Sequence, residues 1–319
     1  MSTGVPAIEA RDLAKRYGAA TALGGVCLTV ESGELFGVIG PDGGGKTTLL
    51  RICATLVLPD AGHATVLGRD VVRDMWALRR RIGYMPGRFS LYPDLSVEEN
   101  LQFFAAVFGS TVEAAADRIT PIYSQLAPFR ARRAGALSGG MKQKLALCCA
   151  LVHRPDILLL DEPTTGVDAV SRREFWDLLG GLRASGLTTV VSTPYMDEAT
   201  RCDRVALMQA GRLLAVDTPD GITRAFDRPL LAVRADDRYR ALLALRQFPH
   251  ARTVYPFGES LHYTDLRADR PASELGPEIE AFLRGCGLHT ASATSIPASV
   301  EDAFMARMDA PVPVPGDAR

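Results

Sequence analysis

The sequence lacks a long hydrophobic run, and its charge is nearly balanced. None of its apolar stretches approaches the roughly 18 consecutive residues that a membrane-spanning helix needs. Residues 1–10 contain neither a basic segment nor an apolar core, so we expect no signal peptide. The formal net charge of −1 creates no field that would attract a polyanion, so we expect no nucleic-acid partner.

Paired cysteines are also missing. The 6 cysteines stand at positions 27, 53, 148, 149, 202 and 286, and none shows CxxC spacing. His153 follows Cys149 closely, but two candidate ligands alone do not make a zinc site. The pattern therefore favours free, mostly buried thiols in a cytosolic protein.

The composition does allow a substantial core. Of the 319 residues, 47% are hydrophobic and 23% charged, which excludes global disorder and fits one large domain plus a small one. Short strand patterns come first, at residues 7–10 and 26–30, and the glycines at 24–25 predict a turn before the second of them.

An α/β pattern follows. Residues 35–39 form a compact apolar run that leads into a glycine-rich loop and a helical pattern at 47–55. Strand patterns return at 157–160, 188–192 and 205–208, with helical segments between them. Apolar strands that alternate with helices predict a parallel sheet covered on both faces.

Residues 95–151 differ, because they show helical spacing and no strand pattern. Ser96 followed by Glu99 has the form of a capping box, which marks the start of a helix. We therefore predict a helical subdomain, at about residues 89–152, inserted into the α/β domain.

After residue 225 the pattern changes again. The order of predicted elements is β-α-β-β-α-β plus a last helix, which predicts a small α+β appendage, ferredoxin-like in its order. The strands are expected at 230–233, 253–255, 260–263 and 289–295, and the helices at 238–248, 277–286 and 300–308. We thus expect a large domain at 1–225, an accessory domain at 226–310 and a disordered, proline-containing tail at 311–319.

A phosphate-binding loop is the strongest local motif. Residues 40–47 match G-x-x-x-x-G-K-[ST] between a buried strand and a helix. The glycines let backbone N–H groups point at a phosphate, Lys46 supplies charge for the β/γ oxygens, and the Thr47 hydroxyl can ligate Mg²⁺. A merely flexible turn would not need Gly-Lys-Thr at this offset. The predicted ATP-binding residues here are Gly40, Pro41, Asp42, Gly43, Gly44, Gly45, Lys46, Thr47 and Thr48.

Two carboxylates follow the apolar run at 157–160. Ligands of open α/β sheets lie beyond the carboxyl ends of the strands. We predict that Asp161 holds Mg²⁺ through water and that Glu162 orients and polarises the attacking water. Adjacent acidic residues after a strand are often only a solvated turn, but the preceding phosphate loop favours the catalytic interpretation.

Residues 137–145 separate this chain from other phosphate-loop proteins. They resemble the signature motif of ABC ATPases, and they stand just before the 157–161 strand, as in that family. A serine and two glycines at a helix start form an anion site. In the family this site faces the γ-phosphate bound by the opposite subunit, which implies a dimer. The corresponding residues are Ser138, Gly139, Gly140, Met141, Lys142 and Gln143.

Other segments fit the resemblance, which covers about residues 7–225. Tyr17 resembles the aromatic residue that stacks on adenine, although a tyrosine near a strand end can also be simple packing. Asp168 resembles the aspartate of the D-loop, which crosses the dimer interface. Residues 83–101 further resemble ATP-binding subunits paired with ABC-2-type permeases, mostly exporters.

Two positions depart from the family pattern. Gly87 stands where the family usually has a glutamine that contacts Mg²⁺ or the attacking water and relays nucleotide state to the permease. Pro194 stands where the family usually has the switch histidine that hydrogen-bonds the γ-phosphate. Neither side chain has a donor or acceptor, so we expect slow hydrolysis unless Arg88 or Tyr195 substitutes.

The resemblance implies a P-loop NTPase fold: a RecA-like parallel sheet, an ABC antiparallel β-subdomain and the inserted helical subdomain. It implies an ATP-binding and ATP-hydrolysing subunit that uses ATP and Mg²⁺. The implied partners are a separate membrane permease and a second ATP-binding subunit, at the inner face of the cell membrane. A regulatory half of a heterodimer with little turnover, and a non-transport ABC protein, remain the alternatives.

Overall fold

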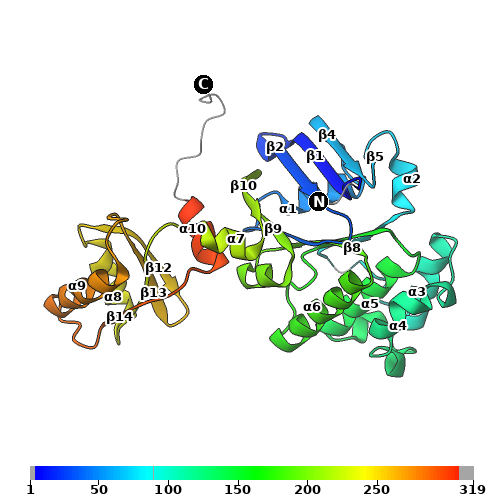
Figure 1. The fold of residues 1–319 in the computed structure, drawn as a ribbon. Coiled ribbons are helices and arrows are strands. Elements are labelled where there is room, and N and C mark those ends of the chain that lie inside the picture. Colours follow the sequence, from blue (N-terminus) through cyan, green and yellow to red (C-terminus); the bar gives the residue numbers. More distant parts are fainter. Residues whose placement is uncertain (1–3, 89, 309–319) are drawn as a thin grey trace. The chain divides into compact units, whose positions relative to one another are not determined.

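The structure, a computed structural model, describes residues 4–88 and 90–308. The tail expected at 311–319 lies outside the described residues. The chain divides into two compact units, 1–219 and 220–319 (Figure 1). The division falls before the expected boundary at residue 225, so that α7 (Pro219–Arg224) belongs almost entirely to the second unit.

The first unit contains, among its described residues, a six-stranded sheet of order β10-β9-β3-β8-β7-β6. Neighbouring strands run parallel, except that β10 is antiparallel to β9. β3, β7 and β8 are buried over their whole length. The sequences of β3 and β7 are accordingly almost continuously apolar, whereas β8 is rich in hydroxyl residues. The predicted α/β class is confirmed. The strands are β3 (Leu35–Ile39), β6 (Ile82–Met85), β7 (Ile157–Asp161), β8 (Thr188–Thr193), β9 (Arg204–Gln209) and β10 (Arg212–Asp217).

An antiparallel sheet of order β2-β1-β4-β5 lies beside it (Figure 1). The turn predicted at residues 24–25 is wrong, because both glycines lie inside β2. Gly25 has φ +82°, and the β1–β2 register shifts next to it, so this is a bulge rather than a turn. The chain reverses instead at Gly18, with φ +58°. The strands are β1 (Ile8–Tyr17), β2 (Ala20–Val30), β4 (Ala61–Val66) and β5 (Arg69–Asp70).

Helix α1 (Lys46–Cys53) lies between the two sheets of the first unit. Its buried residues Leu49, Leu50 and Ile52 share one hydrophobic core with apolar residues of both sheets. This packing holds the start of α1 against the carboxyl ends of β3 and β7. Outside the helical subdomain, the described residues of this unit also form α2 (Met75–Arg79) and α6 (Ala169–Ala184).

The inserted helical subdomain contains α3 (Val97–Val107), α4 (Ala116–Tyr123) and α5 (Gly139–Leu151). The capping box predicted at the start of α3 is present. The Ser96 hydroxyl accepts from the Glu99 backbone N–H at 3.1 Å, and the Glu99 carboxylate accepts from the Ser96 N–H at 2.7 Å. Across residues 4–88 and 90–308, no helix combines the length and the hydrophobicity needed to cross a bilayer.

The second unit has a four-stranded sheet of order β12-β13-β11-β14 among the described residues, with antiparallel neighbours. With β-α-β-β-α-β connectivity this order is ferredoxin-like. The helix expected at 277–286 begins earlier, at Ala272, because Leu275 is buried on the same face as Ile279 and Leu283. The elements are β11 (Leu230–Arg234), α8 (Arg238–Arg246), β12 (Ala251–Phe257), β13 (Ser260–Asp265), α9 (Ala272–Gly285), β14 (Ser292–Ser295) and α10 (Val300–Met308).

Candidate active site

The loop between β3 and α1 approaches other backbone segments too closely to carry side chains at two of its glycines. A Cβ on Gly40 would stand 1.9 Å from the Met208 carbonyl oxygen. A Cβ on Gly45 would stand 2.4 Å from the Ala22 carbonyl oxygen, and Gly45 also has φ +103°. Gly40 and Gly45, both predicted for phosphate contact, are therefore also required by the local packing.

Lys46, the first residue of α1, has its ammonium group folded over this loop. Its Nζ donates to the carbonyl oxygens of Gly40 at 2.8 Å and Pro41 at 3.0 Å. It also lies 3.2 Å from the Glu162 carboxylate. The side chain is only 2% exposed; the Glu162 carboxylate balances its charge, and the two carbonyl oxygens orient the ammonium group.

A cavity of about 370 Å³ opens over the loop. The structure thus brings most of the predicted phosphate-binding residues together with the catalytic candidate Glu162. The lining residues are Ala22, Asp42, Gly43, Gly44, Gly45, Lys46, Thr47, Thr48 and Glu162.

Asp161 is the last residue of β7, only 2% exposed, and two hydroxyls meet its carboxylate. The Thr47 hydroxyl donates to Oδ1 at 2.9 Å and the Ser192 hydroxyl to the same atom at 2.7 Å. Mg²⁺ prefers oxygen ligands and keeps several waters, so the Thr47 hydroxyl beside a carboxylate fits this ion. Ser192 was not predicted, and its only signal in the sequence is a hydroxyl residue near the end of a predicted strand.

Glu162 has an unusual backbone conformation. Its φ of +50° lies in the left-handed region, which non-glycine residues occupy at a cost. Its N–H donates to the Ser192 carbonyl and hydroxyl oxygens, both at 3.0 Å, which holds this conformation in place. The turn directs the carboxylate into the cavity, towards Lys46, while Asp161 stays beneath it.

Tyr84 of β6 is a second residue that the sequence did not single out. Its hydroxyl lies 3.5 Å from Asp161 Oδ2, the carboxylate oxygen not used by Thr47. Burial, together with the nearby Asp161 charge, raises the pKa of Tyr84 to about 12. Because β6 is the parallel neighbour of β7, the tyrosine reaches the carboxylate across the sheet rather than along the chain.

Gly87 lies directly against the carboxylate-bearing turn. A Cβ at this position would stand 2.9 Å from the Asp161 carbonyl oxygen and 3.6 Å from the Glu162 Cβ. The loop would have to move before any side chain could be accommodated there. Gly87 is therefore a close-packing position here, in addition to lacking the family's usual glutamine.

Pro194 follows β8 in a segment held by the buried Glu198, which is 3% exposed. Glu198 accepts hydrogen bonds from the hydroxyls of Thr193 and, at 2.9 Å, Thr164. This carboxylate, missed in the sequence, joins the segment after β7 to the segment after β8. Tyr195 lies under the Arg172 guanidinium, 4.9 Å from ring centroid to Cζ, and does not line the cavity.

The remaining predicted residues lie outside this cavity. Tyr17, 49% exposed, ends β1, and the Lys15 ammonium stands 5.6 Å from its ring centroid. Ser138 caps α5 by accepting from the Met141 N–H at 3.3 Å, and Asp168 caps α6. Hydrogen bonds from backbone N–H groups lower the pKa of Asp168. Helices α5 and α6 are in close contact, since a Cβ on Gly140 would stand 2.6 Å from Ser171.

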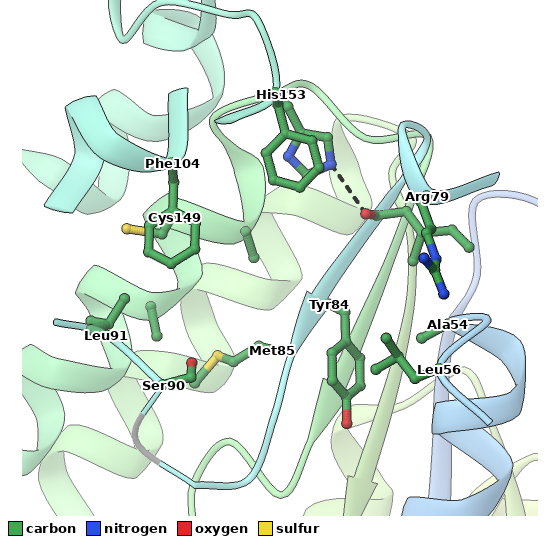
Figure 2. A pocket seen from close by; sticks show the side chains of 14 residues that line it. Ala54, Leu56, Arg79, Tyr84, Met85, Ser90, Leu91, Phe104, Cys149 and His153 are labelled. Carbon is green, nitrogen blue, oxygen red and sulfur yellow. Dashed lines mark hydrogen bonds between the residues drawn. The ribbon is translucent and has the colours of Figure 1, made fainter. Parts of the chain in front are cut away.

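A separate apolar groove of about 350 Å³ lies between β6 and helices α3 and α5 (Figure 2). Phe104 and Phe108 come from the helical subdomain, and Leu56 from the segment after α1. His153 donates through Nε2 to the Ile82 carbonyl at 3.1 Å. Its ring stacks on that of Phe108, with 3.9 Å between the ring centroids. Figure 2 shows that Tyr84 lies in the same groove, so one side chain touches both the groove and Asp161.

This fold and this cavity define a phosphate-loop nucleotide-binding protein. The family described as ABC transporter matches residues 23–165. Nod factor export ATP-binding protein I of Burkholderia lata is 39% identical over 221 residues, covering 68% of this chain and 73% of its own length. The chain belongs to the family of ABC transporter ATP-binding proteins. The predicted family and the predicted P-loop NTPase fold are confirmed.

Two further similarities extend the comparison. The probable multidrug ABC transporter ATP-binding protein YbhF of Escherichia coli is 42% identical over 221 residues, or 69% of this chain. The matched part is 38% of YbhF, so this chain spans well under half of that relative. The Nod factor export protein of Ralstonia nicotianae is 36% identical over 262 residues, 80% of both chains.

Solved structures agree with this assignment. An ATP-binding subunit of an ABC transporter gives a TM-score of 0.62 at 28% identity, covering 69% of this chain and 92% of its own. A dimeric ATP-binding cassette in a post-hydrolysis state, bound to ADP and Pi, gives 0.59 at 26% identity, covering 66% and 98%.

Proposed function

We propose that this chain is the ATP-hydrolysing subunit of an ABC exporter and drives transport through a separate membrane permease. The observation that carries the proposal is the cavity that joins the loop at 42–48 to Glu162, with the Thr47–Asp161 pair beneath it. Two relatives named for export, one in Burkholderia lata and one in Ralstonia nicotianae, support the direction of transport.

The residues around the cavity have different roles in this proposal. The loop N–H groups and Lys46 bind the β- and γ-phosphates, and Thr47 and Asp161 hold Mg²⁺, which neutralises phosphate charge when bound. Glu162 accepts a hydrogen bond from the attacking water and polarises it. Turnover of ATP by the purified chain, and its co-purification with a polytopic membrane protein, test the proposal. An absence of both would contradict it.

We infer that a second ATP-binding subunit completes each site. Ser138 is exposed at the start of α5, where helix N–H groups favour an anion, but it does not line this chain's own cavity. A γ-phosphate presented by another subunit is the ligand that this geometry suits. The dimeric relative with ADP and Pi supports this arrangement, in which Asp168 and the Gly139–Gln143 segment also face the partner.

Ser138→Arg tests the second subunit. In the isolated chain ATP affinity should stay within about twofold, because Ser138 does not contact this chain's nucleotide. In the assembled transporter turnover should fall by roughly 100-fold, since bulk and charge would stand where the γ-phosphate docks. Nucleotide titration and ATPase assays measure both quantities. Ser124→Arg, an exposed serine of the same subdomain, is the control, and equal turnover in the two variants would contradict the dimer proposal.

We propose that the permease contacts the apolar groove of Figure 2. On the same helix as the groove residue Phe104, Phe103 is 38% and Val107 62% exposed, and the Phe103 ring contacts that of Phe104, which leaves further apolar surface for a partner. Tyr84 provides a physical link from this groove to Asp161, because it lines the groove while its hydroxyl reaches the carboxylate. The chain would then lie on the inner face of the cell membrane, attached through the permease.

A regulatory half-subunit with little turnover is the second candidate. Gly87 and Pro194 favour it, because neither side chain can hydrogen-bond water or the γ-phosphate. In this candidate the chain's intact signature segment serves a competent partner site, while its own site holds ATP.

Pro194→His separates the two candidates. If the own site is slow for lack of this donor, the histidine should raise turnover on the order of tenfold or more. Pro194→Ala is the control, because it also frees the backbone N–H but adds no imidazole. Steady-state ATPase rates, with melting curves to compare folding, measure the effect. Equal rates in the wild type and both variants would show that position 194 does not limit hydrolysis. Gly87→Gln is the poorer test, since its Cβ would displace the loop against Asp161.

A further inference from the structure

The second unit contains a pocket of about 220 Å³ in which three arginines meet. Arg252 comes from β12, Arg307 from α10, and Arg228 from the segment before β11. Thr253, Thr264 and one carboxylate, that of Asp227, are the other polar residues of the lining. We propose that this pocket binds a small anion that carries a phosphate group, independently of the nucleotide site in the first unit.

Two of the arginines are oriented by backbone carbonyl oxygens, which leave the positive charge of the guanidinium groups unbalanced. Arg228 Nη1 donates to the carbonyl oxygens of Asp265 at 3.3 Å and Leu266 at 3.2 Å. Arg307 Nη1 donates to the Ala303 carbonyl at 3.0 Å. Carbonyl oxygens orient a guanidinium but do not neutralise it. The remaining N–H groups of both side chains are available for an oxyanion.

The same unit shows what a neutralised arginine looks like. Outside the pocket, Arg267 is bound by the carboxylates of Asp265 at 2.8 Å and Glu278 at 3.1 Å. Inside it, the nearest carboxylate is that of Asp227, which is 3.8 Å from Arg228 Nε and 84% exposed. Among the described residues Arg252 forms no ion pair. Among the described residues that line the pocket there are thus three arginines and one carboxylate, and that carboxylate is solvated.

The threonines add a neutral donor. The hydroxyls of Thr253 and Thr264 are hydrogen-bonded to one another across β12 and β13. That bond uses one hydroxyl proton, so the second remains to donate to a ligand. Guanidinium forks together with a hydroxyl donor match the oxygens of a phosphate group.

Size restricts the ligand further. Pockets for drug-sized ligands start at roughly 300 Å³, so this one suits a phosphate with a short substituent rather than a whole nucleotide. A soluble phosphate monoester and the head group of an anionic phospholipid share this chemistry.

The test uses the full-length chain. Glycerol phosphate is titrated by calorimetry, and binding to phosphatidylglycerol vesicles is compared with phosphatidylcholine vesicles by flotation. We expect Arg252→Ala and Arg307→Ala each to weaken binding by about tenfold, as the loss of one charge-assisted hydrogen bond implies. Arg252→Lys keeps the charge but loses the two parallel N–H donors of the guanidinium group. Its affinity should lie between those of the alanine variants and that of the wild type. Asp227→Asn should bind more tightly than the wild type.

Two variants make the result specific. Arg246→Ala removes an exposed arginine of α8 outside the pocket and should leave binding unchanged. Lys46→Ala weakens phosphate binding at the loop of the first unit and should leave the pocket's binding intact, which separates the two sites. If Arg252→Ala and Arg307→Ala lose binding of glycerol phosphate, the ligand is a soluble phosphate. If they lose the preference for phosphatidylglycerol vesicles, the ligand is a lipid head group. Equal behaviour of Arg252→Ala and Arg246→Ala in both assays would overturn the proposal.

Discussion

Replacing Lys46 by alanine should reduce ATP affinity by roughly 10- to 100-fold, because a hydrogen bond to a charged group contributes about 1.5–3 kcal/mol. The ammonium group is buried and stands beside the loop that is proposed to bind the β- and γ-phosphates. No other lysine or arginine lines the cavity, within the part of the chain that the structure describes. The loss should therefore not be compensated locally. Titration with a fluorescent ATP analogue measures it.

Arg81→Ala is the matched control for this variant. Arg81 also belongs to the first unit, but its side chain is paired with Asp156 at 2.6 Å on the surface. Its removal lowers the net positive charge by the same amount and should leave ATP affinity within about twofold, because exposed charges are screened. Unchanged affinity in Lys46→Ala would contradict the phosphate-loop assignment. Melting curves of both variants show whether the change of affinity comes from unfolding.

Replacing Glu162 by glutamine should leave ATP binding largely intact and reduce hydrolysis by roughly 100-fold or more, the range of general base catalysis. Glutamine keeps the size of the side chain, but its neutral amide accepts hydrogen bonds from water more weakly than a carboxylate. The variant also removes the negative charge that stands 3.2 Å from Lys46, which leaves that ammonium free for phosphate. An ATP-bound dimer should therefore accumulate, visible by size-exclusion chromatography with ATP and Mg²⁺.

Glu113→Gln controls for the loss of one carboxylate. Glu113 is exposed in the helical subdomain and lies outside the cavity. Its replacement should alter neither hydrolysis nor dimer accumulation. If Glu162→Gln hydrolysed ATP as fast as this control, another residue would have to polarise the water.

Local motifs could be predicted because the residues that identify them in the sequence are also the residues that make their contacts. The capping box of Ser96 and Glu99 closes within one helical turn, so its two hydrogen bonds follow from a spacing of three. The loop at 40–47 likewise needs only its own glycines, Lys46 and Thr47, between a strand and a helix. The strand and helix order of the second unit was also visible, because alternating and helical apolar spacing are short-range patterns.

Prediction failed where the outcome depended on a distant partner. The glycines at 24–25 suit a turn by themselves, yet pairing with β1 keeps them in a strand and turns Gly25 into a bulge. Similarly, Pro277 suits a helix start, but burial of Leu275 extends α9 backwards. In both cases the free energy gained by tertiary packing outweighs the local conformational preference of the residues.

The chemical groups of the site can be identified from the sequence alone: the loop with Lys46, the Thr47 hydroxyl, and two carboxylates after an apolar strand. Their surroundings, in contrast, depend on the fold. The order of the parallel strands brings Ser192 and Tyr84, from either side of β7, onto Asp161. It also places Glu198 between two loops and Gly87 against the Asp161 carbonyl. These contacts join residues far apart in the chain, and sheet pairing, rather than any local spacing, creates them.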